Sequence, residues 1–197
     1  MNLPNKLTLS RLVLTLAFLF IIFLDPNPWR DTVALFLFSA ASITDYFDGM
    51  IARRDKLITN FGILMDPLAD KILVCSAFIA FVGEHWIPAW MVVVVVSREL
   101  AITGLRLLAA SQNVVLAAER FGKHKTISQI VAILALLVLQ GYRHWGAFGE
   151  TVVGFQIAGQ PWIVWFTSLS VWLAIILTFT SGSIYLWRNR RLYLQDL

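Results

Sequence analysis

The sequence of 197 residues is 58% hydrophobic and only 14% charged, and its mean hydropathy is +0.73. Because an ordinary soluble domain carries about 25% charged residues, this composition excludes a soluble globular protein and indicates a polytopic membrane protein. The net charge of +4 is explained by lysine and arginine gathered on one side of a membrane, so nucleic-acid binding is not inferred. The single cysteine, Cys75, excludes an internal disulfide.

Six apolar segments predict an all-α integral membrane protein with six transmembrane helices in one domain, residues 1–197. The predicted helices comprise residues 7–24, 32–54, the run 72–83 with Asp70 and Lys71 before it, the run 86–97 with Arg98 and Glu99 after it, and residues 126–142 and 161–187. Turns and loops are expected at 25–31, 111–125 and 143–160. Pro67 leaves two interpretations open, a helix that starts beside it or a kink inside a longer helix.

Four carboxylates lie between residues 45 and 70. Asp45 and Asp48 are three residues apart, and Asp66 and Asp70 are four apart, so on helices each pair projects from one face. Carboxylates crowded into a poorly hydrated site require either protonation or a multivalent cation, and the cation is the simpler interpretation. Oxygen ligands alone suit Mg²⁺, Mn²⁺ or Ca²⁺ and argue against structural zinc.

These ionisable groups are predicted to lie within the membrane thickness. The apolar part of the second helix, Val33–Thr44, would be about 18 Å long, which is too short to span. The third and fourth helices place charged groups at a similar depth, about 10 Å inside the same face. Since intramembrane charges almost always face a bundle interior or a cavity, the sequence predicts a polar cavity.

Small residues and an arginine accompany the aspartates. Gly49 and Ala52 remove bulk beside Asp48, Gly62 precedes Asp66 by one turn, and Arg53 supplies a fork of donors. A metal, an arginine and exposed backbone together suit a pyrophosphate. The alternative is a set of interfacial charges with small residues for helix packing.

The spacing of this region resembles the signature of the CDP-alcohol phosphatidyltransferase family. The matching positions are Asp45-x2-Asp48-Gly49-x2-Ala52-Arg53-x8-Gly62-x3-Asp66-x3-Asp70. The resemblance implies a six-helix membrane enzyme that moves a phosphatidyl group from CDP-diacylglycerol to an alcohol and releases CMP. It also implies two divalent cations, Mg²⁺ or Mn²⁺, held by Asp45, Asp48, Asp66 and Asp70, with Asp70 as the catalytic base.

A donor site for CDP-diacylglycerol is expected from two parts of the chain. Asn5 and Thr8 stand near the entrance of the first helix with Arg11, where they either cap the helix or contact the nucleotide. The second interpretation comes from the resemblance, in which an N-terminal Pro-Asn-x-x-Thr region lies beside CDP. Gly49, Arg53 and Gly62 are the remaining predicted donor-site residues.

A second anion site is predicted on the fourth and fifth helices, formed by Arg98, Arg106, Lys123, Lys125 and Thr126. Arg98 and Arg106 share a broad helix face. The structural alternative is that Arg98 pairs with Glu99 or an aspartate while the lysines extend to the membrane interface. The sequence blocks around these residues resemble those of bacterial phosphatidylglycerophosphate synthases, which implies sn-glycerol 3-phosphate as the acceptor alcohol.

Lysine and arginine placement predicts the orientation. With both termini in the cytoplasm, all Lys and Arg residues except Arg30 and Arg143 lie toward the cytoplasm, so the cavity should open there. The expected location is the bacterial cytoplasmic membrane, and the resemblance allows a homodimer. Three alternatives remain: an acceptor such as inositol phosphate, serine or phosphatidylglycerol; a divalent-cation transporter; or a nonenzymatic membrane scaffold. His85, His124 and His144 receive no role.

Overall fold

The computed structural model of the protein describes residues 3–55, 60–112, 114, 116 and 121–194, with side chains described in these ranges except at 3–4, 45–55, 60–61, 63–64, 66 and 121–123. The first part of the chain is a series of long helices. They are α1 (Leu3–Ile22), α2 (Arg30–Asp55), α3 (Asn60–Gly83), α4 (Ala89–Ser111) and α5 (Phe121–Gly141). The helix starting at Phe121 takes in residues that the sequence assigned to a loop.

A compact connection follows α5. It contains a 3-10 helix η1 (Tyr142–His144), a short α6 (Gly146–Phe148), a π-helix η2 (Gly149–Val153) and two antiparallel strands, β1 (Gln156–Ile157) and β2 (Gln160–Pro161). Ala158 and Gly159 form the tight turn between the strands, both with positive φ, as such turns require. Helix α7 (Trp162–Arg188) and the short α8 (Arg190–Tyr193) end the described chain. The expected loop at 143–160 is therefore largely ordered into short elements.

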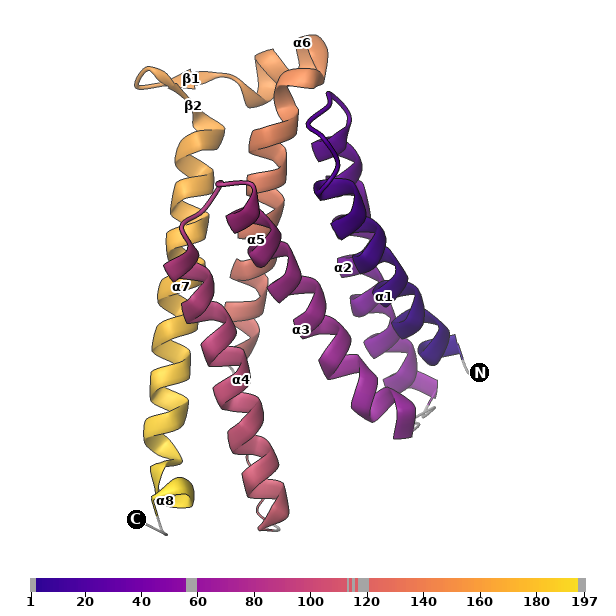
Figure 1. Ribbon diagram of the computed structural model, residues 1–197, viewed down its shortest axis with the longest axis vertical. Helices are drawn as coiled ribbons and strands as arrows, with labels where there is room; N and C mark the ends of the chain where they lie inside the picture. The colour runs from indigo at the N-terminus through magenta and orange to yellow at the C-terminus, as the bar shows by residue number, and fades with distance from the viewer. Residues whose placement is uncertain (1–2, 56–59, 113, 115, 117–120, 195–197) are drawn as a thin grey trace.

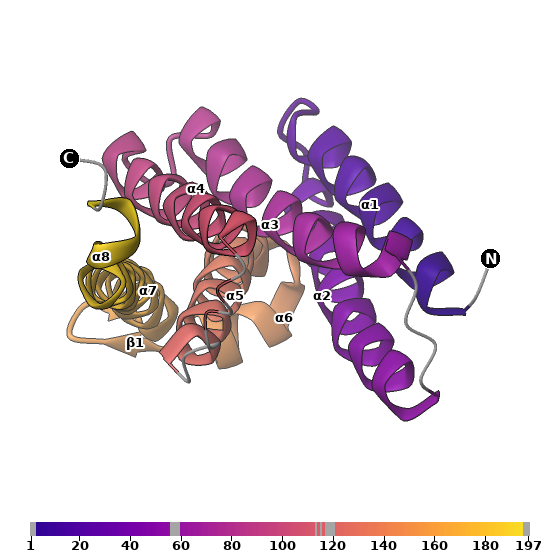
Figure 2. The same cartoon turned by 90° about the horizontal axis from the view of Figure 1, so that it is seen from below.

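The long helices form two adjoining groups (Figure 1). Helices α1 and α2 lie together near the N-terminus, and α4, α7 and α8 lie on the opposite side. Helix α3 contacts both α1 and α4, and α5 contacts both α2 and α7, so these two helices join the groups (Figure 2). The connection containing α6, β1 and β2 covers one end of the bundle, which we call the loop end.

Helix α1 has polar groups inside and apolar groups outside. Thr8, Arg11 and Thr15 are buried, together with Phe18 and Ile22 on the same face. The exposed side chains at helical spacing are Leu9, Val13, Leu16 and Phe20. In water this distribution would be unfavourable, whereas in lipid it buries polar groups and leaves apolar ones facing hydrocarbon. The helix therefore has the polarity of a membrane segment.

Helix α7 packs through small and hydroxyl side chains. Its buried face includes Thr167, Ser170, Ala174, Thr178 and Gly182. Because lipid offers no hydrophobic drive between helices, membrane helices associate by close approach and hydrogen bonds, for which small residues are suited. Thr178 accepts a hydrogen bond of 2.9 Å from Gln129 Nε2 on α5. Helix α7 is thus held closely against its neighbours.

Within the described chain, three segments are long and apolar enough to cross a membrane: Asn5–Ile22, His124–His144 and Trp162–Arg188. Helices α2, α3 and α4 have 26, 24 and 23 residues, which is sufficient length to span about 30 Å. Charged residues such as Asp70, Arg98 and Glu99 lower the hydropathy of α3 and α4. The helical membrane architecture is confirmed, while the number of six spans stays a prediction.

Pro67 lies inside α3, several residues after its start at Asn60. The interpretation in which the helix begins at the proline is therefore wrong, because Asn60–Asp66 are already helical. Proline cannot donate a backbone hydrogen bond to residue 63, so the helical ladder is interrupted one turn before Asp70.

The loop end is fixed by an ion cluster centred on Arg30. Its buried guanidinium donates to Asp31 Oδ1 at 3.0 Å, to Glu84 Oε2 at 2.8 Å and to the Leu24 carbonyl at 3.3 Å. It also lies 6.0 Å from the ring centre of Trp86. These contacts tie the α1–α2 turn to the α3–α4 turn, so we call them the Arg30 cluster.

Candidate functional site

The aspartate motif is divided between two helices. Asp45 and Asp48 lie on α2, and Asp66 and Asp70 lie on α3. Both pairs have helical backbone, so the expected three- and four-residue spacing places each pair on one helix face. The side chains of Asp45, Asp48 and Asp66 lie outside the described residues, as do those of Gly49 and Arg53. Gly62, on α3, is described and partly exposed.

Asp70 forms an ion pair with Arg11. Arg11 Nη1 on α1 donates to Asp70 Oδ1 on α3. The Arg11 side chain is completely buried, whereas that of Asp70 is 45% exposed. A buried arginine therefore holds a carboxylate that still has an accessible side, which is the arrangement expected of a group that meets a substrate.

The inner face of α1 brings the predicted donor-site residues into line with this pair. Thr8 is buried and Asn5 is partly buried, one and two turns before Arg11. Thr15 Oγ1 donates to the Arg11 carbonyl at 2.8 Å and continues the polar stripe. The role of Arg11 was not predicted from the sequence, although its spacing from Asn5 and Thr8 was the available signal.

A second ionic group joins α4 and α5. Lys125 Nζ and Arg98 Nη1 both bind the same oxygen, Glu99 Oε1, the arginine at 3.2 Å. The side chains of Arg98, Glu99 and Lys125 are 15%, 9% and 6% exposed. We call these three residues the Glu99 cluster. The pairing of Arg98 with Glu99 is the structural alternative named above, but Lys125 is buried and does not extend to the interface.

Helix α7 supports Arg98 through a glycine. A Cβ atom on Gly182 would come within 2.7 Å of Arg98 Cγ, so only glycine leaves room for the arginine stem in its present place. Arg98 Nε is buried and has no hydrogen-bond partner among the described residues. The cluster thus contains a buried donor whose hydrogen bond is not made within the described chain. Gly182 was not predicted, because one glycine in an apolar helix carries no distinctive signal.

Lys71 adds a third cation beside the Glu99 cluster. Its Nζ donates to Thr103 Oγ1, and Thr103 Oγ1 in turn donates to the Glu99 carbonyl at 2.7 Å. Lys71 follows Asp70 directly on α3. This contact therefore links the aspartate helix to the helix that carries Arg98 and Glu99, and brings the two ionic groups into one region.

Of the other predicted acceptor-site residues, Arg106 has its described contacts on Tyr185 and not in the Glu99 cluster. Arg106 lies two turns beyond Arg98 on α4, with Nε 3.5 Å from Tyr185 Oη and its guanidinium 5.8 Å from that ring centre. Thr126 is exposed, next to the buried Lys125. The Lys123 side chain lies outside the described residues.

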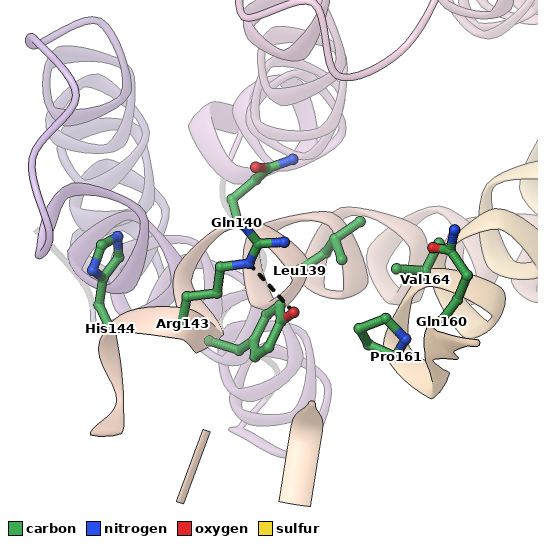
Figure 3. Close-up of a pocket in the computed structure, with 8 residues that line it drawn as sticks. Leu139, Gln140, Arg143, His144, Gln160, Pro161 and Val164 are labelled. Carbon is green, nitrogen blue, oxygen red and sulfur yellow. Dashed lines mark hydrogen bonds between the residues drawn. The ribbon is translucent and has the colours of Figure 1, made fainter. Parts of the chain in front are cut away.

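A cavity of about 380 Å³ lies at the loop end (Figure 3), and its lining includes no residue of either ionic group. It lies between the end of α5, η1 and the start of α7. Its lining includes Gln140, Tyr142, Arg143, His144 and Gln160. Arg143 Nε donates to Tyr142 Oη at 3.5 Å, as the dashed line shows. None of the predicted site residues lines this cavity.

The described residues test the metal prediction only in part. Among them, no group of three or more His, Cys, Asp or Glu side chains could hold a metal ion. Three of the four predicted ligands lie outside that set. What the structure supplies is Asp70, whose partly exposed carboxylate is the right kind of ligand for Mg²⁺ or Mn²⁺, and a helical backbone that keeps each aspartate pair on one face.

Comparisons with known proteins agree with this chemistry. The family model described as CDP-alcohol phosphatidyltransferase matches residues 1–180. The chain is similar to the CDP-diacylglycerol–glycerol-3-phosphate 3-phosphatidyltransferase of Bacillus subtilis, with 40% identity over 95% of each chain. The protein of the same name from Cereibacter sphaeroides is 31% identical, over 99% of this chain and 98% of its own length. A probable phosphatidylglycerophosphate synthase of Mycobacterium tuberculosis is 42% identical, over 73% of this chain and 69% of its own length.

Proposed function

Because the chain belongs to the CDP-alcohol phosphatidyltransferase family, we propose that it transfers the phosphatidyl group of CDP-diacylglycerol to sn-glycerol 3-phosphate. The products are phosphatidylglycerophosphate and CMP. The proposal rests on a 40% identical relative that is named for this reaction. It is supported by two ionic groups of the bundle, the Arg11–Asp70 pair and the Glu99 cluster, in which cations outnumber the carboxylate. The enzyme would act in anionic phospholipid synthesis.

The donor site is proposed at the aspartate motif and the inner face of α1. Asp45, Asp48, Asp66 and Asp70 would hold two divalent cations, which when bound offset the charge of the pyrophosphate. Asn5, Thr8, Gly49, Arg53 and Gly62 are the proposed contacts for the nucleotide and its phosphates. The buried, polar face of α1 supports this assignment, because Thr8 and Arg11 lie on the same stripe that meets Asp70.

Asp70 is the proposed base. It would take the proton of the primary hydroxyl of glycerol 3-phosphate as that oxygen bonds to the β-phosphorus, while the bond from this phosphorus to the CMP oxygen breaks. A carboxylate is a weak base toward an alcohol, so its orientation matters as much as its basicity. Arg11 supports the proposal, since a buried guanidinium on one oxygen fixes the carboxylate, while the Asp70 side chain stays 45% exposed and could meet an acceptor.

The acceptor phosphate is proposed to bind at Arg98, Arg106, Lys123, Lys125 and Thr126. Among these, Arg98 and Lys125 are the best supported, because Arg98 is largely buried, Lys125 is buried, and the two meet at one carboxylate. Arginine and lysine are the usual ligands for phosphate in proteins. An acceptor that carries no phosphate would leave this positive charge without a partner.

The proposed topology has six membrane spans, cytoplasmic termini and a cavity that opens to the cytoplasm. Arg30 and Arg143 lie at the loop end, where Trp145 Nε1 donates to Thr32 Oγ1 at 2.8 Å, and this end would face outward. Labelling of single cysteines placed at Gln112 or His144 in sealed inside-out vesicles tests the orientation. A homodimer, which the family resemblance allows, stays a prediction.

The decisive experiment is CMP release from CDP-diacylglycerol by detergent-purified protein with Mg²⁺ or Mn²⁺. We expect release that requires both the metal and glycerol 3-phosphate. Inositol phosphate, serine and phosphatidylglycerol serve as parallel acceptors, and release with one of them alone would replace the proposed acceptor. Metal flux into liposomes without CMP release would instead support the transporter alternative.

A further inference from the structure

We propose that Glu99 is the positioning residue of the acceptor site: it holds Arg98 and Lys125 on one carboxylate oxygen so that their other donors, with Lys71, bind a phosphate monoester. This inference rests on the proposed function, because it concerns the phosphate of the acceptor alcohol. It assigns a role to Glu99 and Lys71, which the sequence did not place among the site residues.

The charge of this group is not balanced by its own residues. Two cations share one carboxylate in the Glu99 cluster, and Lys71 on α3, bound to Thr103 one helical turn after Glu99 on α4, brings a third. The neighbouring Asp70 is already paired with Arg11. Buried positive charge is unfavourable unless it is compensated. Counted over the described side chains of Arg98, Lys125, Lys71 and Glu99, the excess of two positive charges matches the double negative charge of a phosphate monoester near neutral pH.

The geometry also leaves donors free to act. The carboxylate engages one nitrogen of Arg98 and the single nitrogen of Lys125. Lysine has three donors and arginine five, so both retain N–H groups beyond the bond to Glu99. The buried Arg98 Nε is one of them. Gly182 and Glu99 fix the arginine from two sides, and this keeps the remaining donors in a constant direction.

The contact through Thr103 adds a connection to the reacting group. Thr103 Oγ1 joins Lys71 to the backbone of Glu99, and Lys71 is adjacent to Asp70 in α3. An acceptor phosphate bound at Arg98, Lys125 and Lys71 would therefore lie beside the helix that carries the proposed base. The hydroxyl of a three-carbon phosphate ester could then reach Asp70.

The test is Glu99→Gln, which keeps the shape and removes the charge. Because Arg98 and Lys125 would lose their common anchor, we expect KM for glycerol 3-phosphate to rise by at least about tenfold, as for loss of a buried charged contact. KM for CDP-diacylglycerol should stay within about twofold, since the change removes none of the proposed contacts of the donor. Thr178→Val is the matched control, because it removes a buried polar contact between α5 and α7 without touching the cluster.

A purely structural role would lower the yield or thermal stability of Glu99→Gln, as of Thr178→Val, and leave both KM values unchanged; that result overturns the proposal. A fall in the acceptor KM also overturns it, because Glu99 would then compete with the phosphate. If Glu99→Gln does not fold, Glu99→Asp replaces it. This variant keeps the charge but withdraws the carboxylate, so an unchanged acceptor KM would contradict the proposal.

Binding of radiolabelled glycerol 3-phosphate without CDP-diacylglycerol gives a readout that does not depend on turnover. We expect the wild-type protein to bind it and Glu99→Gln to bind at least about tenfold more weakly, with unlabelled glycerol failing to compete. Equal binding by the two proteins overturns the role of Glu99. Failure of the proposed function is distinguishable, because the wild-type protein would then release no CMP with glycerol 3-phosphate.

Discussion

The Arg30 cluster and the Glu99 cluster are mirror images in composition. At the loop end one arginine is shared by two carboxylates, Asp31 and Glu84, and it also binds the Leu24 carbonyl. Inside the bundle one carboxylate is shared by two cations, and Arg98 Nε has no partner in the described chain. In the first cluster all three guanidinium nitrogens of Arg30 are bound. In the second, the cations outnumber the carboxylate and one arginine nitrogen has no partner among the described residues.

The difference in bound and unbound groups indicates that the Arg30 cluster is structural, whereas the Glu99 cluster is suited to bind an anionic ligand. A buried ion pair gives little net stability, but breaking one by removing a partner is costly, so a closed cluster mainly fixes the elements that carry it. An open cationic cluster gains its compensation from a ligand. The Arg11–Asp70 pair is a third case, in which a fully buried cation holds a carboxylate that remains accessible. Variants at these three places should therefore fail in different ways.

The largest effect is expected for Asp70→Asn, which removes the proposed base. Turnover should fall by at least about a thousandfold, within the usual range for loss of a general base and a charged ligand. CMP release under saturating substrates measures the loss. Nucleotide binding should persist, because the amide keeps a carbonyl oxygen toward Arg11. Turnover near the wild-type rate would refute the assignment of Asp70 as base.

Lys125→Met comes next, because it takes one cation from the Glu99 cluster and leaves Arg98 and Glu99 as a balanced pair. The acceptor KM should rise by about 30-fold or more, corresponding to a loss of at least about 2 kcal/mol of binding. The expression level and thermal stability should change little. Steady-state kinetics with each substrate varied separately provides the measurement. An unchanged acceptor KM would place the phosphate elsewhere.

Arg30→Gln should show the reverse pattern. The change leaves Asp31 and Glu84 without their shared cation, so we expect a loss of about 3 kcal/mol in stability. Thermal inactivation in detergent should begin at a lower temperature. The KM values of the protein that remains folded should equal those of the wild type. A specific rise in either KM would mean that the loop end takes part in substrate binding.

Gly182→Ala is expected to have the smallest effect. Its Cβ would press on Arg98 Cγ, so the arginine must shift and the acceptor KM should rise by about threefold, or about 0.6 kcal/mol. Gly104→Ala is the matched control, because a Cβ at Gly104 meets no atom within 4 Å. That control should retain wild-type kinetics. Equal behaviour of the two variants would show that Arg98 is not fixed by α7.

Much of the helical framework follows from the sequence, because long apolar runs and their interruptions have a simple physical cause. The segments expected at 7–24, 32–54 and 161–187 correspond to α1, α2 and α7. The early start of α5 at Phe121 was missed, since its first turn is polar and reads as a loop. The small elements between Gly146 and Pro161 were also missed, because such short pieces have no periodicity to detect.

The candidate site was predictable in its parts but not in its pairings. The spacing of the aspartates and the burial of Arg98 could be inferred from position in the membrane. The partnership of Arg11 with Asp70 joins residues 59 positions apart, and that of Lys125 with Glu99 joins residues 26 apart. Such contacts depend on how helices pack, which local spacing does not specify. Arg106 shows the limit of inference from helix spacing. It shares a helix face with Arg98, but its described contact is with Tyr185 and not with the Glu99 cluster.

The sharing of one Glu99 oxygen by Arg98 and Lys125 restricts how this enzyme could change during evolution. Without a phosphate to bind, the second cation of this cluster is uncompensated, whereas loss of Lys125 alone leaves Arg98 and Glu99 as a neutral pair. Loss of Glu99 together with Lys125 would instead leave Arg98 without a partner in the cluster. Family members with uncharged acceptors are therefore expected to keep the pair at positions 98 and 99 and to lack the cation at position 125.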